Sequence, residues 1–139
     1  MIELDNRTSL DVDTTLLDSI ALKMTDKEIE LIITSNEEIQ QINKEHRGID
    51  KDTDVLSFPY EAIPMGPLGS IVISAEHVQE RAKEFGHDTS EELTLLFIHG
   101  LLHLLGYDHE TDKGEMREEE AKLIKEFRLP QSLIIRTQG

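Results

Sequence analysis

Apolar residues follow two different periods along the chain, and their alternation predicts the fold class. Short apolar or alternating runs, which are typical of strands, occur at residues 2–6, 28–34, 55–58 and 70–74. Apolar residues at helical spacing occur at residues 13–24, 75–85 and 113–127. We therefore expect an α+β fold: a single domain over residues 1–139, with a small mixed β-sheet packed against several helices.

Polar residues at fixed spacing mark the starts of two further helices. Ser35 followed by Glu38 matches the capping-box pattern of a helix start, and this helix is expected to end near Arg47. Thr89 followed by Glu92 repeats the pattern. It is expected to open the most apolar helix of the chain.

The most apolar helix carries two histidines and is followed by a third. His99 and His103 are four residues apart, so on a helix both imidazoles project from the same face, about one turn apart. Gly106 can adopt a positive φ and end the helix, and His109 follows three residues later. This spacing predicts a metal site on a core helix and the following loop, with His99, His103 and His109 as ligands.

The residues around the histidines favour a metal site over an isolated histidine pair, which is more often a surface or hydrogen-bonded core feature. Apolar side chains cover most of the helix circumference: Leu95, Leu96, Phe97, Ile98, Leu101, Leu102, Leu104 and Leu105. Buried polar groups need partners, and a metal ion satisfies both imidazoles. Three imidazoles leave one position of a tetrahedral zinc ion open for water, as in catalytic zinc sites. We expect one Zn²⁺ per chain.

The spacing also resembles the zinc-binding pattern H-E-x-x-H-x-x-G-x-x-H of metzincin proteases. All three histidines and Gly106 match in position, but Gly100 stands where the proteases have their catalytic glutamate. A peptidase needs that carboxylate to activate water and move protons. The sequence therefore argues against peptide hydrolysis.

Composition narrows the class of protein further. The 139-residue chain contains no cysteine, which excludes a disulfide framework and a thiolate metal site. The N-terminal residues lack the basic and apolar regions of a signal peptide, and the apolar stretch at residues 93–105 is too short to span a bilayer. We expect a cytoplasmic protein with no membrane partner. The formal net charge of −15, taken alone, argues against a nucleic-acid partner.

Two segments resemble a known family. Residues 99–109, HGLLHLLGYDH, closely resemble the H-G-x-L-H-L-x-G-Y-D-H signature of the YbeY family of bacterial metal-dependent endoribonucleases. Residues 43–59, NKEHRGIDKDTDVLSFP, resemble that family's segment of an arginine followed by T-D-V-L-S-F. The likeness extends over most of the chain, including its length.

The resemblance implies a single-domain zinc enzyme that cleaves single-stranded RNA, with a role in 16S rRNA 3′-end maturation and ribosome quality control. It implies rRNA as substrate and the ribosome or ribosomal proteins as partners, and no DNA. His99, His103 and His109 match the zinc ligands, and Arg47 matches a functionally important arginine, so we assign Arg47 a catalytic role. Ser70 stands where the family commonly has aspartate, and a role of that aspartate would be dispensable here or taken over by Asp54 or Asp108.

The residues themselves support this reading only in part. Arg47 alone is better explained by a solvated loop charge, although its guanidinium offers a planar fork for phosphate oxygens. Together with Lys44, Lys51 and zinc it would form a local cationic pocket in an acidic protein.

Other polar residues have two interpretations each. Asp54 and Ser57 are either strand-start polar residues or part of the site, and Tyr107 and Asp108 either orient the histidines or form a turn. Residues 115–120 are predicted to be a solvated helix face. The remaining histidines are predicted to be surface residues: His46, His77 and His87.

Three hypotheses follow for the function. The first is hydrolysis of RNA phosphodiesters by water activated at zinc. The second is a ribosome-assembly or RNA-binding factor in which zinc only holds the fold. The third is a zinc hydrolase of a small ester or amide.

Overall fold

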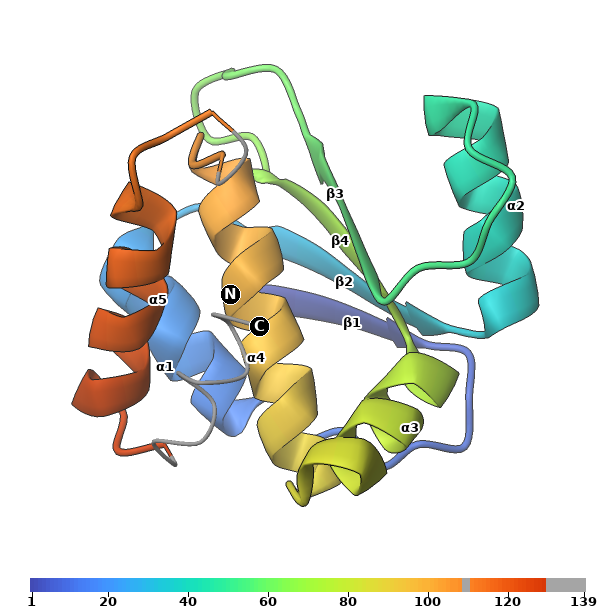
Figure 1. The fold of residues 1–139 in the computed structure, drawn as a ribbon. Helices are drawn as coiled ribbons and strands as arrows, with labels where there is room; N and C mark the ends of the chain where they lie inside the picture. Colours follow the sequence, from blue (N-terminus) through green and yellow to red (C-terminus); the bar gives the residue numbers. More distant parts are fainter. Residues whose placement is uncertain (109–110, 130–139) are drawn as a thin grey trace.

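Four strands form one mixed sheet at the centre of the protein (Figure 1). The computed structural model describes residues 1–108 and 111–129. The strands lie in the order β1-β2-β4-β3. β1, β2 and β4 are parallel, and β3 pairs antiparallel with β4 at the edge of the sheet. Their bounds are Ile2–Asn6 for β1, Ile29–Thr34 for β2, Val55–Pro59 for β3 and Gly69–Ser74 for β4.

The described residues form five helices around this sheet, and the expected α+β fold is confirmed. Two of them follow β1 and β2: α1 (Thr15–Met24) and α2 (Asn36–Arg47). The other three follow β4 in succession: α3 (Ala75–Phe85), α4 (Thr89–Leu104) and α5 (Glu115–Glu126). In the part of the chain described, no helix is both long and apolar enough to cross a membrane.

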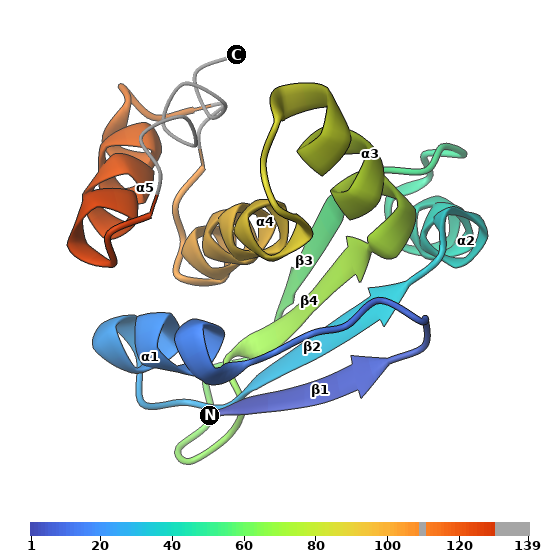
Figure 2. The ribbon, with the colours of Figure 1, turned by 90° about the horizontal axis from the view of Figure 1, so that it is seen from below.

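The two faces of the sheet carry separate apolar clusters, because successive residues of a strand point to opposite faces. Figure 2 shows α1 and α4 on one face and α2 on the other. On the α4 side, Ile71 and Ile73 of β4 join the main core, whereas Val72 lies between them in sequence and packs on the α2 side with Ile39 and Leu56. The edge strand β3 therefore lies between α4 on one face and α2 on the other.

Helix α4 approaches the sheet closely at Gly100. A side-chain carbon at this position would lie 2.8 Å from Ile71 Cγ2 and 3.2 Å from Ser57 Oγ. The Ser57 hydroxyl also donates to the carbonyl oxygen of Gly100, at 3.1 Å. Gly100 thus stands where the helix backbone contacts β3 and β4, and there is no room for the glutamate that metzincins have at this position.

We expect Gly100→Ala to destabilise the protein by about 1–3 kcal/mol. The cost combines overpacking of about 1–3 kcal/mol with about 1 kcal/mol for disturbing the Ser57 hydrogen bond. The better helix propensity of alanine returns about 1 kcal/mol. Urea unfolding of wild type and variant measures the difference. Ser19→Ala, at an exposed site on α1, is the control and should be neutral or slightly stabilising; equal stability of the wild type and Gly100→Ala would contradict the close approach.

The sequence predictions for the starts of three helices need correction, and the first of them, α1, begins at Thr15 rather than at residue 13. The capping box of α4 consists of Asp88 and Glu91, whose side chains and backbone N–H groups bond reciprocally, and not of Thr89 and Glu92. Glu92 is instead fully buried. The last helix begins at Glu115 and ends at Glu126, slightly inside the predicted 113–127, because Gly114 has a positive φ and precedes the first helical residue.

Candidate metal centre and cleft

His99 and His103 face each other at the C-terminal end of α4, as their spacing predicts. Their rings have centroids 4.7 Å apart at an interplanar angle of 75°, and their Nε2 atoms are 3.2 Å apart. Both side chains are partly buried, on a helix whose other residues are mostly core. The pair therefore directs two ring nitrogens to one point beside the sheet.

The other ring nitrogen of His99 has a partner that the sequence analysis did not identify. His99 Nδ1 lies 2.8 Å from Oε1 of Glu120 on α5. Glu120 is only 3% exposed and Met116 is fully buried, so the prediction of a solvated face over residues 115–120 is wrong at these two positions. The signal was present in the sequence: Met116, Leu123 and Ile124 are apolar and buried, and their helical spacing places residue 120 on the same face.

The geometry of the pair fits a zinc ion. Two nitrogens bound to a tetrahedral zinc at about 2.0–2.1 Å are about 3.3 Å apart, close to the observed 3.2 Å. His109, the third predicted ligand, lies outside the described residues. Within residues 1–108 and 111–129 no set of three ligands is complete, so the three-histidine site stays a prediction.

The histidine pair opens into a cleft of about 750 Å³. Its walls come from the end of α2, the edge strand β3, the end of α4 and the residues that follow α4. The residues that line the cleft are His46, Arg47, Thr53, Asp54, Val55, Ser57, Phe58, Pro59, His99, His103, Gly106, Tyr107 and Asp108. The two segments that the sequence analysis singled out, residues 43–59 and 99–109, thus meet in one cleft.

Arg47 is the last residue of α2. The helix itself is held in place by side-chain contacts at its first turn. Ser35 caps the helix, as predicted, by accepting a hydrogen bond from the backbone N–H of Glu38. The Thr34 hydroxyl and the Arg7 guanidinium donate to the Glu38 carboxylate and lower its pKa. The carboxylate therefore stays ionised beside the positive end of the helix dipole.

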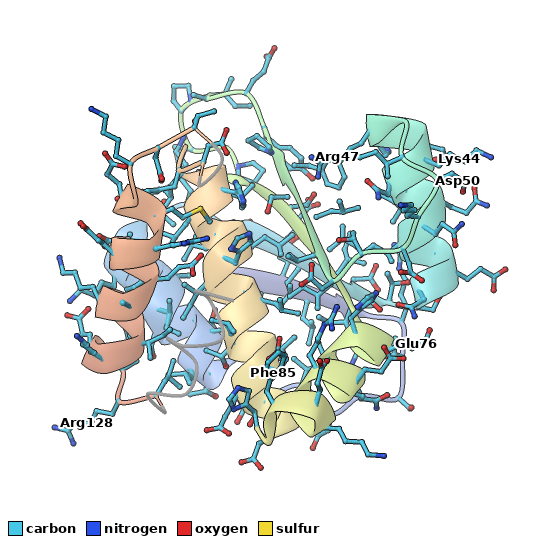
Figure 3. The ribbon with its side chains drawn as sticks, in the orientation of Figure 1. Lys44, Arg47, Asp50, Glu76, Phe85 and Arg128 are labelled. Carbon is cyan, nitrogen blue, oxygen red and sulfur yellow. The ribbon has the colours of Figure 1, made fainter. Side chains whose placement is uncertain are left out.

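At the other end of α2, only one of the three predicted cations faces the cleft. Figure 3 shows Arg47 directed from the end of the helix toward β3, with Lys44 on the other side of the helix, beside Asp50. Lys44 Nζ lies 4.0 Å from Asp50 Oδ2. Neither Lys44 nor Lys51 is among the residues that line the cleft, so the predicted cluster of three cations is reduced to Arg47.

Four of the residues with two interpretations lie in the wall of the cleft. Asp54, Ser57, Tyr107 and Asp108 all line it. Asp54 Oδ1 also accepts a hydrogen bond from the backbone N–H of Val55, at 2.8 Å. His46, predicted to be a surface residue, is exposed but belongs to the cleft wall, where its ring packs against Phe58 at 5.3 Å.

Ser70 does not belong to the cleft. It is paired with Phe58 of β3, in the same alternation as Val72, which packs on the α2 side of the sheet. The histidines belong to α4, which packs on the opposite face of the sheet. Asp54 and Asp108, the two aspartates that could take over the role of an aspartate at position 70, both line the cleft.

Fold and cleft together define a class of protein. It is a small α+β protein in which two helices, on opposite faces of a mixed sheet at its edge strand, bring a histidine pair at ligand spacing and an arginine into one cleft. The chain belongs to the endoribonuclease YbeY family, whose model matches residues 3–128. This confirms the resemblance drawn from the two sequence segments.

Individual relatives support the same assignment. The endoribonuclease YbeY of Sulfurimonas denitrificans is 63% identical over 139 residues, which is all of both chains. That of Sulfurovum is 61% identical, with 98% of this chain and 97% of the relative covered. The solution structure of a Thermotoga maritima protein superposes with a TM-score of 0.63 at 33% identity, covering 91% of this chain and 89% of the other.

Proposed function

We propose that this chain is a zinc-dependent endoribonuclease, one domain over residues 1–139, that hydrolyses phosphodiesters of single-stranded RNA. Its membership of the endoribonuclease YbeY family supports cleavage of RNA. The observation that carries the proposal is that one cleft holds both the paired Nε2 atoms of His99 and His103 and the side chain of Arg47. His109 completes the proposed ligand set.

The charges in the cleft support a role for a divalent ion. The described residues that line the cleft include one arginine, Arg47, and two carboxylates, Asp54 and Asp108. The protein groups alone therefore do not give the cleft the positive charge that attracts a polyanion. A bound zinc ion would turn the balance positive, and it would supply Lewis acidity and activate water. The local field, rather than the net charge of −15, then governs RNA binding.

Arg47 is proposed to hold the scissile phosphate. Its guanidinium can donate two parallel hydrogen bonds to the non-bridging oxygens. As water attacks phosphorus and the bond to the leaving ribose oxygen breaks, negative charge accumulates on those oxygens. Donors placed there in advance stabilise the transition state more than the ground state.

Aromatic rings in the same cleft favour an unpaired substrate. His46, Phe58 and Tyr107 all line it. Unstacked bases pack on aromatic side chains in single-strand recognition, whereas the bases of a duplex are already stacked on each other. The cleft therefore suits a single strand.

The position of Gly100 counts against a peptidase. The close contacts with Ile71 and Ser57 leave no space for a catalytic glutamate on α4. The zinc hydrolase of a small ester or amide is retained as an alternative. So is the assembly factor in which zinc only stabilises the fold.

The biological role is proposed on the strength of the family. We infer that the chain acts in 16S rRNA 3′-end maturation and ribosome quality control, with the ribosome or ribosomal proteins as partners and in the cytoplasm. Cells depleted of this protein would then accumulate 16S rRNA with unprocessed 3′ ends.

Removal of the metal tests the proposal directly. We expect an end-labelled single-stranded RNA to be cut by the protein reconstituted with zinc. Treatment with a chelator should lower the rate about 1,000-fold, because metal catalysis supplies several kcal/mol and each 1.4 kcal/mol is a factor of ten. The same RNA annealed to its complement is the matched substrate and should be cut at least about tenfold more slowly.

The chemistry of the product ends is the second readout of the same assay. Attack by water leaves linear ends, whereas a 2′,3′-cyclic phosphate would show that the ribose 2′-hydroxyl is the nucleophile. A zinc-loaded protein that binds the RNA without cutting it would instead support the assembly factor.

A further inference from the structure

Glu120 is a carboxylate in the middle of an otherwise apolar helix face. On α5 it lies between Met116, Leu123 and Ile124, all of which are buried against the core. Removing a carboxylate from water costs several kcal/mol, which a leucine at this position would avoid. Its contact with His99 Nδ1, at 2.8 Å, joins two helices across 21 residues of sequence.

This contact determines which nitrogen of His99 carries the proton. A carboxylate accepts hydrogen bonds, so Nδ1 must donate its proton to Oε1 of Glu120. In the neutral imidazole, Nε2 then has a lone pair. That atom is directed at Nε2 of His103, 3.2 Å away, where the metal is expected.

We propose that Glu120 is the positioning residue of the metal centre: it holds His99 in the tautomer, and at the ring angle, in which Nε2 is the ligand. The inference rests on the proposed metal site, and not on RNA cleavage. In metal sites such outer carboxylates orient histidine ligands and raise their basicity. Because Glu120 belongs to α5, the docking of α5 on α4 is also required for tight metal binding.

Two substitutions separate positioning from a structural role. Glu120→Leu fills the site without a hydrogen bond, and it should weaken zinc binding about 10–100-fold while the thermal stability of the metal-free protein is kept or raised. Glu120→Gln retains an oxygen that accepts from Nδ1, and it should lose less than about tenfold. Glu118→Gln, on the exposed face of the same helix, is the control. Zinc affinity is measured by competition with a chelating dye.

Nitrogen-15 spectra of the metal-free protein give a readout that needs neither zinc nor activity. The wild type should show His99 protonated at Nδ1, and Glu120→Leu should lose this preference. Unchanged zinc affinity in Glu120→Leu would overturn the proposal, as would protonation of wild-type His99 at Nε2. Should Glu120→Leu fail to fold, the wild-type spectrum and the Gln variant still decide. If the wild type takes up no zinc, the proposed function fails, and the His99 spectrum still tests the role of Glu120.

Discussion

Replacing His103 by alanine is expected to lower RNA cleavage by about 1,000-fold or more while the protein stays folded. The substitution removes one of the two Nε2 atoms that lie 3.2 Å apart, and with it the means to hold a metal that supplies several kcal/mol of transition-state stabilisation. The fold should tolerate the change because the side chain lies in the last turn of α4 and is only partly buried. Zinc content, measured on the same samples, should fall in parallel.

The measurement is cleavage of an end-labelled single-stranded RNA by wild type and variant purified side by side. Far-ultraviolet circular dichroism confirms that both are folded. His77→Ala is the matched control, because His77 is also a partly buried helical histidine but pairs with Asp52 and lies outside the cleft lining. Equal cleavage by His103→Ala and wild type would show that the activity belongs to another site or to a contaminating nuclease. An unfolded His103→Ala would favour zinc as a structural element only.

The sequence predicted most elements because local patterns and the tertiary structure agree. Gly48 and Gly86 follow α2 and α3 with φ values of 70° and 72°, which glycine adopts without strain, so both helix ends could be read from the chain. The order of the strands could not. The pairing of β2 with β4, and of β4 with β3 in the opposite direction, depends on contacts between distant segments that no local period encodes.

Ambiguous local patterns account for the errors. The run DTSEE at residues 88–92 contains two candidate capping boxes, one residue apart, and only the tertiary structure buries Glu92 and leaves Glu91 at the helix start. Likewise, three consecutive glutamates at residues 118–120 look like a solvated face, although the third is on the buried side of α5. The high density of charge suggested that this face of α5 is solvated, whereas the spacing of the apolar residues shows which face of the helix is buried.

The histidine pair was predictable and the rest of the cleft was not. Four-residue spacing fixes His99 and His103 on one helix face whatever the fold. The distance from Arg47 to that pair, by contrast, is set by how α2 and α4 pack on opposite faces of the sheet around β3. Arg47 could therefore be identified from the sequence only through the family resemblance. Lys44 and Lys51 are close to it in sequence, but the packing leaves them outside the cleft.

Arg47→Ala is expected to reduce cleavage about 100–1,000-fold, the usual effect of removing one donor that stabilises transition-state charge. Zinc binding should be unchanged, because the side chain is exposed at the end of α2 and is not a proposed ligand. Arg47→Lys keeps the charge but loses the planar fork, so it should recover only part of the rate. Lys44→Ala, one turn earlier and paired with Asp50, is the matched control and should behave as wild type.

The kinetic constants distinguish how Arg47 acts. A role in the transition state lowers kcat and kcat/KM together, whereas a role in holding the RNA alone raises KM and leaves kcat intact. We expect the first pattern, because the guanidinium lies in the same cleft as the histidines and is proposed to bind the phosphate oxygens on which charge accumulates. Full activity of Arg47→Ala would make Arg47 a solvated charge at a helix end. If, in addition, His103→Ala were unfolded, the two results together would favour the assembly factor over the nuclease. The metal would then support the fold, and Arg47 would not act on phosphate.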